Sequence, residues 1–367
     1  MPELRIGTAR AQAGAITHGW FEAFRLPTGE SERFPITIAC GQADGPVAWI
    51  TTGIHGDEHT GLAVLHHLIT PELVESLHGT LIAVLSLSPA GLRTRKRIPY
   101  TATEDPNRLF PSPIQGNENE PLRRKPRGLE GAYARLYQLI VTTAPACLVD
   151  LHNAWIGSVP FVFRDPVFFG KDAGGRTRRD AARLLSKVDS LIEATGLTPV
   201  NEFAASSYLD MNLHRSVSGA VLNGAGIPAV TIELGSRMYI DGGVVEACAA
   251  GLRNVLRASG LLEGQHEPVT GVPVIRPGYP VRRHMGPTAP DSGIVQFLVR
   301  PGDAISEGQV VARLVDIFGE PVGPDSGLLR SEHDGFVLGW PHGVVRYEGE
   351  AVLALAIRDE RDLLVPA

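Results

Sequence analysis

The sequence predicts an α/β fold with a largely parallel or mixed sheet flanked by helices, followed by a smaller all-β part. Continuous apolar runs rich in β-branched residues predict buried strands, and the helix-like stretches between them predict crossover helices. After about Glu263 the helical periodicity disappears, and Pro, Gly and short β-branched runs continue to the C-terminus. With 367 residues the chain can bury a large core, and we expect two domains, over residues 1–263 and 264–367.

Strands and helices are expected to alternate along the first part of the chain. We expect strands at 34–40, 47–54, 80–87, 147–151, 159–163 and 229–233, and helices at 61–69, 129–141, 180–195 and 243–258. In open α/β sheets, ligand sites lie just beyond the carboxyl ends of the strands. Polar residues at these ends are therefore the first candidates for a functional site.

The all-β part contains a weak internal repeat. One half runs from Ser292 to Val311 and the other from Asp334 to Val352, and each reads as strand, turn and strand. This pattern predicts a small closed module of the barrel-sandwich type found in lipoyl and biotinyl carriers. A carrier needs a lysine at the hairpin tip, but the last lysine of the chain is Lys187. We therefore expect a structural role, as a rim for the functional site or as an oligomer contact.

Composition and charge exclude several classes of function. The net charge is −6 with no basic tail, so we expect no nucleic-acid partner. No N-terminal signal is evident, and no apolar run approaches the ~18 residues of a membrane span. The three isolated cysteines, Cys40, Cys147 and Cys248, are typical of buried thiols in a reducing compartment. We expect a cytoplasmic protein with a small-molecule substrate, without a membrane partner and possibly assembled from several copies of this chain.

A metal site is indicated where the strand expected at 47–54 ends. His55 and Glu58 follow Gly53 directly, three positions apart, so an imidazole and a carboxylate can converge on one divalent cation. Zinc is the candidate, because a catalytic zinc takes three protein N/O ligands and leaves one position open. We therefore expect one Zn²⁺ per chain and a third ligand elsewhere in the sequence.

His152 is the candidate for the third ligand. It ends the apolar run that begins at Cys147, where an unpaired imidazole would be costly to bury. Asp150 lies on the same face of the strand, because side chains alternate along it. Its carboxylate can orient a ligand through a hydrogen bond, or it can cap a local turn instead.

Glu233 is the candidate general base. It ends a β-branched strand and precedes Gly235, which is a poor setting for a solvated carboxylate. Near a zinc-bound water such a group can take a proton and later give it to a leaving nitrogen. The structural alternative is an ion pair between Glu233 and Arg237.

A further segment offers groups for a polar substrate. It contains Arg93, Arg95 and Arg97 and continues to the pair Asn107-Arg108, which lies in a proline-bounded loop. Arginine binds carboxylates through a planar fork and can neutralise a developing oxyanion. The segment therefore indicates anion recognition.

Together these residues resemble the succinylglutamate desuccinylase and aspartoacylase family, which is related to the zinc carboxypeptidases. The resemblance covers roughly residues 45–240 and rests on four motifs in order: His55-x-x-Glu58, Arg97 followed by Asn107-Arg108-x-Phe110-Pro111, Asp150-Leu151-His152, and Glu233-Leu234-Gly235. It implies a zinc-carboxypeptidase-like mixed sheet, and the C-terminal β part also fits the family. One departure is Pro106, where the family commonly has leucine.

The resemblance implies a function and a role for each residue. His55, Glu58 and His152 would bind zinc, and Glu233 would be the general acid and base. Arg97 would polarise the scissile carbonyl, a role that Arg93 or Arg95 could take instead. Asn107 and Arg108 would hold a substrate carboxylate. Residues 1–263 would then be a zinc-dependent deacylase that hydrolyses the amide of an N-acyl amino acid, with acyl group and amine unspecified.

Three alternatives remain at this stage. A zinc metallocarboxypeptidase acting on peptides would use the same chemistry. The string His55-Gly56-Asp57-Glu58-His59 also matches an inverted zincin pattern, which requires both histidines on one helix. The third alternative is a non-enzymatic binding protein on the same scaffold. We expect the specificity loops at 112–128, 164–178 and 202–218, with Tyr208, Arg215 and Arg237 as candidate pocket residues.

Overall fold

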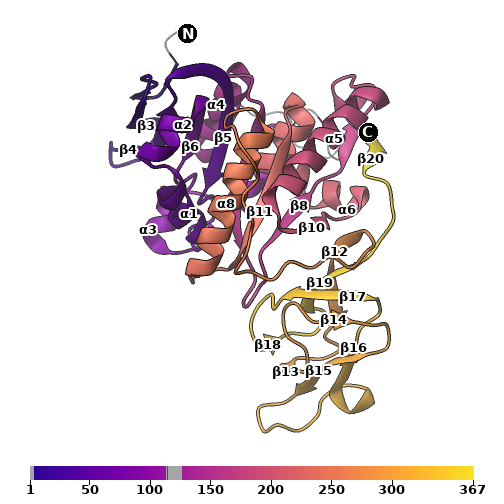
Figure 1. Ribbon diagram of the computed structural model, residues 1–367. Helices are drawn as coiled ribbons and strands as arrows, with labels where there is room; N and C mark the ends of the chain where they lie inside the picture. The colour runs from indigo at the N-terminus through magenta and orange to yellow at the C-terminus, as the bar shows by residue number, and fades with distance from the viewer. Residues whose placement is uncertain (1–3, 113, 115–125) are drawn as a thin grey trace.

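A mixed sheet of twelve strands runs through the whole protein in the computed structural model, which describes residues 4–112, 114 and 126–367 (Figure 1). In spatial order its strands are β14 (Ala304–Ile305), β17 (Gly335–Gly339), β19 (Ala351–Arg358), β12 (Val281–Thr288), β10 (Thr198–Asn201), β8 (Phe161–Arg164), β11 (Ala229–Ser236), β7 (Cys147–Ala154), β5 (Ala43–Thr52), β6 (His78–Val84), β4 (Ser31–Cys40) and β3 (Ala15–Arg25).

The remaining elements are smaller sheets and helices. The smaller sheets pair β1 (Arg5–Ile6) with β2 (Ala9–Arg10), join β9 (Val167–Phe169) to β20 (Leu364–Pro366), and order β16 (Leu328–Arg330), β15 (Val310–Val315), β13 (Gly293–Phe297) and β18 (Val345–Arg346). The helices are α1 (Thr60–Leu68), α2 (Pro71–Ser76), α3 (Pro89–Thr94), α4 (Gly128–Thr142), α5 (Arg178–Thr195), α6 (Ala205–Asp210), α7 (Val217–Gly219) and α8 (Gly242–Ala258), with a short 3-10 turn, η1, at Pro106–Arg108.

Strand direction brings the candidate site residues to one edge of the sheet. β6, β5, β7 and β11 are parallel neighbours, so their carboxyl ends coincide. β8 runs antiparallel to β11, and β10 runs parallel to β8. Glu233 of β11 lies opposite His152 of β7 in the register. The order therefore fixes an imidazole and a carboxylate side by side on neighbouring strands.

Helices cover both faces of this sheet. Leu151 and Ile232 are register partners, and Leu151 faces α1, where Gly61 allows a close approach. Thr231, on the opposite face, bonds to Ser218 of α7 with 2.8 Å between the hydroxyl oxygens. α8 contacts α1, α5 and β11, and Figure 1 shows it lying across β11. The mixed α/β architecture is confirmed, with all six expected strands and all four expected helices present.

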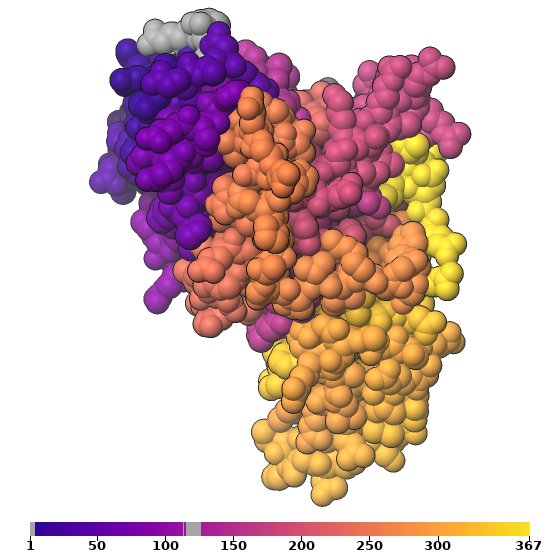
Figure 2. Space-filling view, in the orientation of Figure 1, coloured from indigo at the N-terminus to yellow at the C-terminus, as the bar shows by residue number. Residues whose placement is uncertain are grey.

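The C-terminal part differs from the expected barrel sandwich. Four of its strands, β12, β19, β17 and β14, extend the large sheet through a β10–β12 contact at Asn201 and Arg282. Four others form the separate sheet of β16, β15, β13 and β18. Among the described residues no closed barrel forms, because each set of strands keeps its own edges. Figure 2 shows this part as a lobe beside the rest of the molecule.

The cysteines and the helices also bear on the sequence-based expectations. Cys40, Cys147 and Cys248 are buried and unpaired, as their apolar settings indicate. In the part of the chain that the structure describes, no helix is both long and apolar enough to span a membrane.

Gly61 provides a test of the packing beneath the site. A Cβ there would lie 2.0 Å from Thr52 Oγ1 and 3.0 Å from Leu151 Cβ. We expect Gly61→Ala to lower the free energy of unfolding by about 1–3 kcal/mol through overpacking, although alanine favours helices. Denaturant unfolding measures the change. Gly242→Ala, on the first residue of α8 with open space around it, is the control and should not destabilise the protein. Equal stability of the two variants would contradict this account.

Candidate metal centre and its cavity

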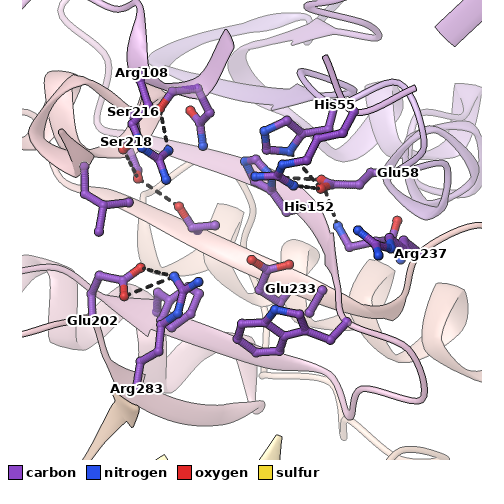
Figure 3. A pocket seen from close by; sticks show the side chains of 18 of the residues that line it. His55, Glu58, Arg108, His152, Glu202, Ser216, Ser218, Glu233, Arg237 and Arg283 are labelled. Carbon is purple, nitrogen blue, oxygen red and sulfur yellow. Dashed lines mark hydrogen bonds and ion pairs between the residues drawn. The ribbon is translucent and has the colours of Figure 1, made fainter. Parts of the chain in front are cut away.

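His55, Glu58 and His152 lie together as a buried group that could hold a metal ion. One ligand atom of each lies within 4.8 Å of the others. The carboxylate of Glu58 lies between the two imidazoles, with Oε1 2.7 Å from His55 Nδ1 and Oε2 2.9 Å from His152 Nδ1. Figure 3 shows both rings turned toward Glu58. The backbone N–H of Asn153 also donates to Glu58 Oε2.

A strand-to-helix turn carries the first two of these residues. β5 ends at Thr52, Gly53 has a φ of +63°, and α1 begins only at Thr60. Gly56 lies so close to Gly91 that a Cβ would meet its backbone at 1.9 Å. His59 occupies the N-cap position of α1 without a capping bond from its side chain, and its Nε2 lies 3.0 Å from the carbonyl oxygen of Gly56. His55 and His59 therefore do not share a helix, as the inverted zincin pattern would require.

A second carboxylate holds the far side of each imidazole. Nε2 of His152 lies 2.7 Å from Asp150, and Nε2 of His55 lies 2.9 Å from Asp105. Donation of Nε2–H to these carboxylates leaves both Nδ1 lone pairs facing Glu58. Lone pairs and a carboxylate attract one another only through a cation or a proton between them. The donor set of two nitrogens and one carboxylate fits a borderline metal such as zinc.

The charges within this group shift each other's pKa. Burial alone would raise the pKa of Glu58, but the two histidines outweigh it and hold that pKa well below its usual value. Burial likewise opposes the charged form of His152, but Asp150 and Glu58 outweigh it and raise its pKa well above the usual value. The site thus favours a positive charge beside Glu58.

Glu233 faces the same cavity with an uncompensated carboxyl group. Its Oε2 is buried and has no hydrogen-bond partner among the described residues. Burial raises the pKa of Glu233 to about 7, although the nearby His152 opposes the rise. Arg237 is directed elsewhere, with Nη1 3.9 Å from Asp57 and Nη2 donating to the carbonyl of Pro341. Arg237 therefore pairs with Asp57, and not with Glu233 as the structural alternative for Glu233 would require.

Arg97 lies beside the metal group and shares its carboxylates. Its Nη1 donates to Glu58 over 3.1 Å, and its Nη2 donates to Asp105 over 2.9 Å. Arg93 instead pairs with Glu32, and Arg95 ends α3 in a left-handed conformation. Of these three arginines, Arg97 alone is among the described residues that line the cavity.

Asn107 and Arg108 reach the cavity from the 3-10 turn η1. Asp105 caps this turn by accepting from the backbone N–H of Asn107, and Pro106 occupies its first position, where no N–H is needed. The Asn107 side chain accepts from the N–H of Val217. Arg108 donates to the carbonyls of Met211 and Asn107 and has no carboxylate partner in the described structure. Pro106, where the family commonly has leucine, therefore fits the first position of this turn. The guanidinium of Arg108 has no ion-pair partner among the described residues of the cavity.

Other residues complete the cavity wall (Figure 3). The candidates Tyr208 and Arg237 line it, whereas Arg215 pairs with Glu130 instead. Four further wall residues lie in the segments 164–178 and 202–218, where specificity loops are expected: Asp165, Glu202, Ser216 and Ser218. The sequence gives no indication of the others, which are Trp155, Phe163, Thr231, Arg283, Pro341 and His342. Asp165 and Glu202 each directly follow a strand, β8 and β10, and this strand-end position was a usable signal.

The chain is similar in sequence to a known family and to a curated relative. Residues 44–164 match the family model of the succinylglutamate desuccinylase/aspartoacylase catalytic domain. The chain is 23% identical to the N-alpha-acetyl-L-2,4-diaminobutyric acid deacetylase of Halomonas elongata over 358 residues, which covers 89% of this chain and 87% of that protein.

Solved structures show the same fold at low sequence identity. The product-bound ectoine utilization protein EutE of Ruegeria pomeroyi superposes with a TM-score of 0.72 at 19% identity, covering 97% of each chain. A succinylglutamate desuccinylase from Silicibacter sp. TM1040 gives a TM-score of 0.71 at 19% identity, covering 98% of this chain and 97% of that one. The matched catalytic-domain model and the curated relative confirm the resemblance seen in the motifs, and the solved structures share the fold: residues 44–164 resemble the catalytic domain of the succinylglutamate desuccinylase and aspartoacylase family.

Proposed function

We propose that this protein is a zinc-dependent hydrolase that cleaves the amide bond of N-acyl amino acids. One observation carries the proposal: a buried His–Glu–His group and an unpaired, partly buried carboxyl group, that of Glu233, face one cavity. The curated relative is named as a deacetylase of an N-acetylated amino acid, which agrees with this reaction. The substrate would be a small molecule that fits between the metal group and Arg108.

Each predicted residue has a role in the proposed reaction. His55, Glu58 and His152 would hold one zinc ion, with Asp105 and Asp150 orienting the imidazoles. A zinc ion here would act as a Lewis acid toward the acyl carbonyl and would lower the pKa of water. The two histidine–carboxylate pairs set the direction of both Nδ1 atoms before any ion binds.

Proton transfer is assigned to Glu233. Its pKa of about 7 suits a group that must accept a proton from the attacking water and return it to the departing nitrogen near neutral pH. The absence of a hydrogen bond at Oε2 leaves that oxygen available for the transfer. Glu233 would therefore act twice in each turnover, first as base and then as acid.

Substrate charge is assigned to the arginines. Arg97 lies within reach of the metal ligands and would donate to the carbonyl oxygen as negative charge develops on it. Arg108, with Asn107 beside it, would hold the substrate carboxylate, since its guanidinium has no carboxylate partner in the described structure. These positions would orient the scissile bond between the metal group and η1.

For the C-terminal part we propose a structural role at the rim. Pro341 and His342 line the cavity, and the backbone of Trp340 pairs with that of Ile156. The C-terminal part has its own hydrophobic cluster, formed between the second β sheet, with Val295 and Leu314, and the end of the large sheet, with Val352 of β19, and this cluster supports a domain boundary near residue 264.

The proposed function can be tested with a panel of substrates. Zinc-loaded protein, incubated with N-acetyl and N-succinyl amino acids and with short peptides, should release free amine from N-acyl amino acids in preference to peptides. Chelation should abolish the activity and added zinc should restore it. Metal analysis can follow the zinc content of the protein at each step. Release of C-terminal amino acids from peptides would identify a metallocarboxypeptidase instead. A zinc-loaded protein that hydrolyses neither class would overturn the proposal.

Glu233→Gln tests the proton-transfer role. The amide keeps the shape of the side chain but cannot accept the proton, so we expect kcat to fall about 10²–10⁴-fold. The bound zinc, measured by elemental analysis, should stay at one per chain. Glu246→Gln, on an exposed position of α8, is the matched control and should retain kcat. A Glu233→Gln variant with normal kcat would remove Glu233 from the mechanism.

Asp105→Asn tests the support of the metal group. Loss of the carboxylate behind His55 should weaken zinc binding about 10–100-fold, as measured by competition with a chromophoric chelator. The same change removes a partner of Arg97, so kcat should fall as well. Asp44→Asn, an exposed carboxylate on β5, provides the control. Unchanged zinc affinity in Asp105→Asn would show that His55 does not need this partner.

A further inference from the structure

We propose that Asp165, with the hydroxyl groups of Ser218 and Thr231, forms a subsite for a cationic group of the substrate. The preferred substrates would then be N-acyl amino acids whose side chain carries a second, protonated amino group. This inference rests on the proposed hydrolase function and specifies the substrate class for the same cavity.

Asp165 presents a carboxylate oxygen without a partner to the cavity. The residue directly follows β8 and is only 6% exposed. Its Oδ2 accepts from the hydroxyls of Tyr208, over 3.1 Å, and Ser218, over 3.3 Å. Its Oδ1 has no hydrogen bond or ion pair with any residue that the structure describes, although Asp165 lines the cavity. Oδ1 is not one of the fully buried side-chain atoms without a partner, so it is accessible from the cavity, where a cationic ligand can pair with it.

Among the described residues no cation forms an ion pair with Asp165, although the charge of Arg283 lies nearby. Glu202, the other acidic group on this side, already pairs with Arg283, whose Nη1 lies 3.1 Å from its Oε2. Arg283 is also held over the rings of Trp155, Phe163 and Phe203. Burial, assisted by the negative charge of Glu202, raises the pKa of Asp165 to about 7. An ammonium group beside Asp165 would offset both the burial of its carboxylate and the repulsion by Glu202.

The hydroxyl groups beside Asp165 suit an ammonium ligand. Ser218 Oγ lies 3.3 Å from Asp165 Oδ2 and 2.8 Å from Thr231 Oγ1, so three oxygen-bearing side chains form a chain along this wall. An ammonium has three donors and no acceptor, and hydroxyl oxygens keep lone pairs for such donors. A substrate carboxylate would instead meet the negative charge of Asp165.

A positive charge, the guanidinium of Arg108, lies on the same side of the cavity as Asp165 and Ser218. Asn107, next to Arg108, accepts from the N–H of Val217 in the same short helix as Ser218. Figure 3 shows Arg108, Ser216 and Ser218 on one side of the cavity and the metal group on the other. This side therefore offers a cation and an anion together. An amino acid with an α-carboxylate and a side-chain ammonium matches both, with its acyl group directed to the metal group.

Three substrates of similar size test the proposal on the zinc-loaded full chain. They are Nα-acetyl-2,4-diaminobutyrate, its uncharged isostere N-acetylnorvaline, and N-acetylaspartate. We expect kcat/KM to be at least about tenfold higher for the cationic substrate than for the other two. Asp165→Asn should lower the ratio of kcat/KM between the cationic substrate and its isostere about 10–100-fold, chiefly through KM. Equal kcat/KM values, or a ratio that Asp165→Asn does not change, would overturn the proposal.

Two further variants control for loss of structure. Asp189→Asn removes a partly exposed carboxylate that pairs with Arg164, next to Asp165, and should keep the wild-type ratio. Thr231→Val keeps the shape of the side chain but removes its hydroxyl, and should lower the ratio about three- to tenfold. Thermal melting identifies any variant that fails to fold. If Asp165→Asn does not fold, the kcat/KM ratio of Thr231→Val decides whether the subsite exists. An unchanged ratio in Thr231→Val would count against the subsite.

Binding separates this inference from the proposed function. Calorimetry with free 2,4-diaminobutyrate and with norvaline needs no turnover. Tighter binding of the diamino acid, weakened at least about tenfold by Asp165→Asn, would support the subsite even if no amide were hydrolysed. Equal binding of the two amino acids would overturn it. Hydrolysis of N-acetylnorvaline and N-acetylaspartate without a preference for the cation would leave the hydrolase proposal standing and exclude the subsite.

Discussion

The carboxylate of Glu58, held between two imidazoles, is the constraint on which the site depends. This contact brings together His55 and Glu58 from the turn after β5 and His152 from β7, so it depends on the parallel pairing of these two strands. A shift of one residue in β7 would turn His152 and Asp150 to the opposite face. Behind the histidines, the buried carboxylate of Asp150 and the partly buried carboxylate of Asp105 each have a donor. The sheet register, the helix entry at α1 and the loop at Asp105 therefore form one connected arrangement.

Much of this arrangement could be predicted because it is local in the sequence. The apolar strands, the residues at their ends and the glycine turn at Gly53 are visible without a structure, and they placed His55, Glu58, His152 and Glu233 near one another. The matching of Glu233 with His152 follows from β7 and β11 being parallel neighbours. Periodicity and strand-end rules capture such features, because they depend on a few consecutive residues.

The remaining wall could not be predicted because it depends on contacts between distant segments. Asp105 supports His55 across fifty positions, and its loop has no periodicity. Arg283 comes from β12, which meets the N-terminal part of the sheet at β10 through the pair Asn201 and Arg282. The repeat in the C-terminal part indicated strands correctly, but not that four of them would extend the large sheet rather than close a barrel. Strand pairing between remote segments is the information that a single sequence lacks.

The pairing of β20 with β9 holds the segment that follows Asp165, a residue of the cavity wall. β9 begins two residues after Asp165, and its parallel partner β20 lies at Leu364–Pro366. His152 and Glu233 sit on the central parallel strands and His55 and Glu58 just beyond one of them, whereas Asp165 sits in a connection held by a remote strand. Substitutions along that strand pairing could retune which amino acid is accepted without disturbing the reaction centre. Such a division would let relatives of one scaffold diverge in substrate while retaining the same hydrolytic apparatus.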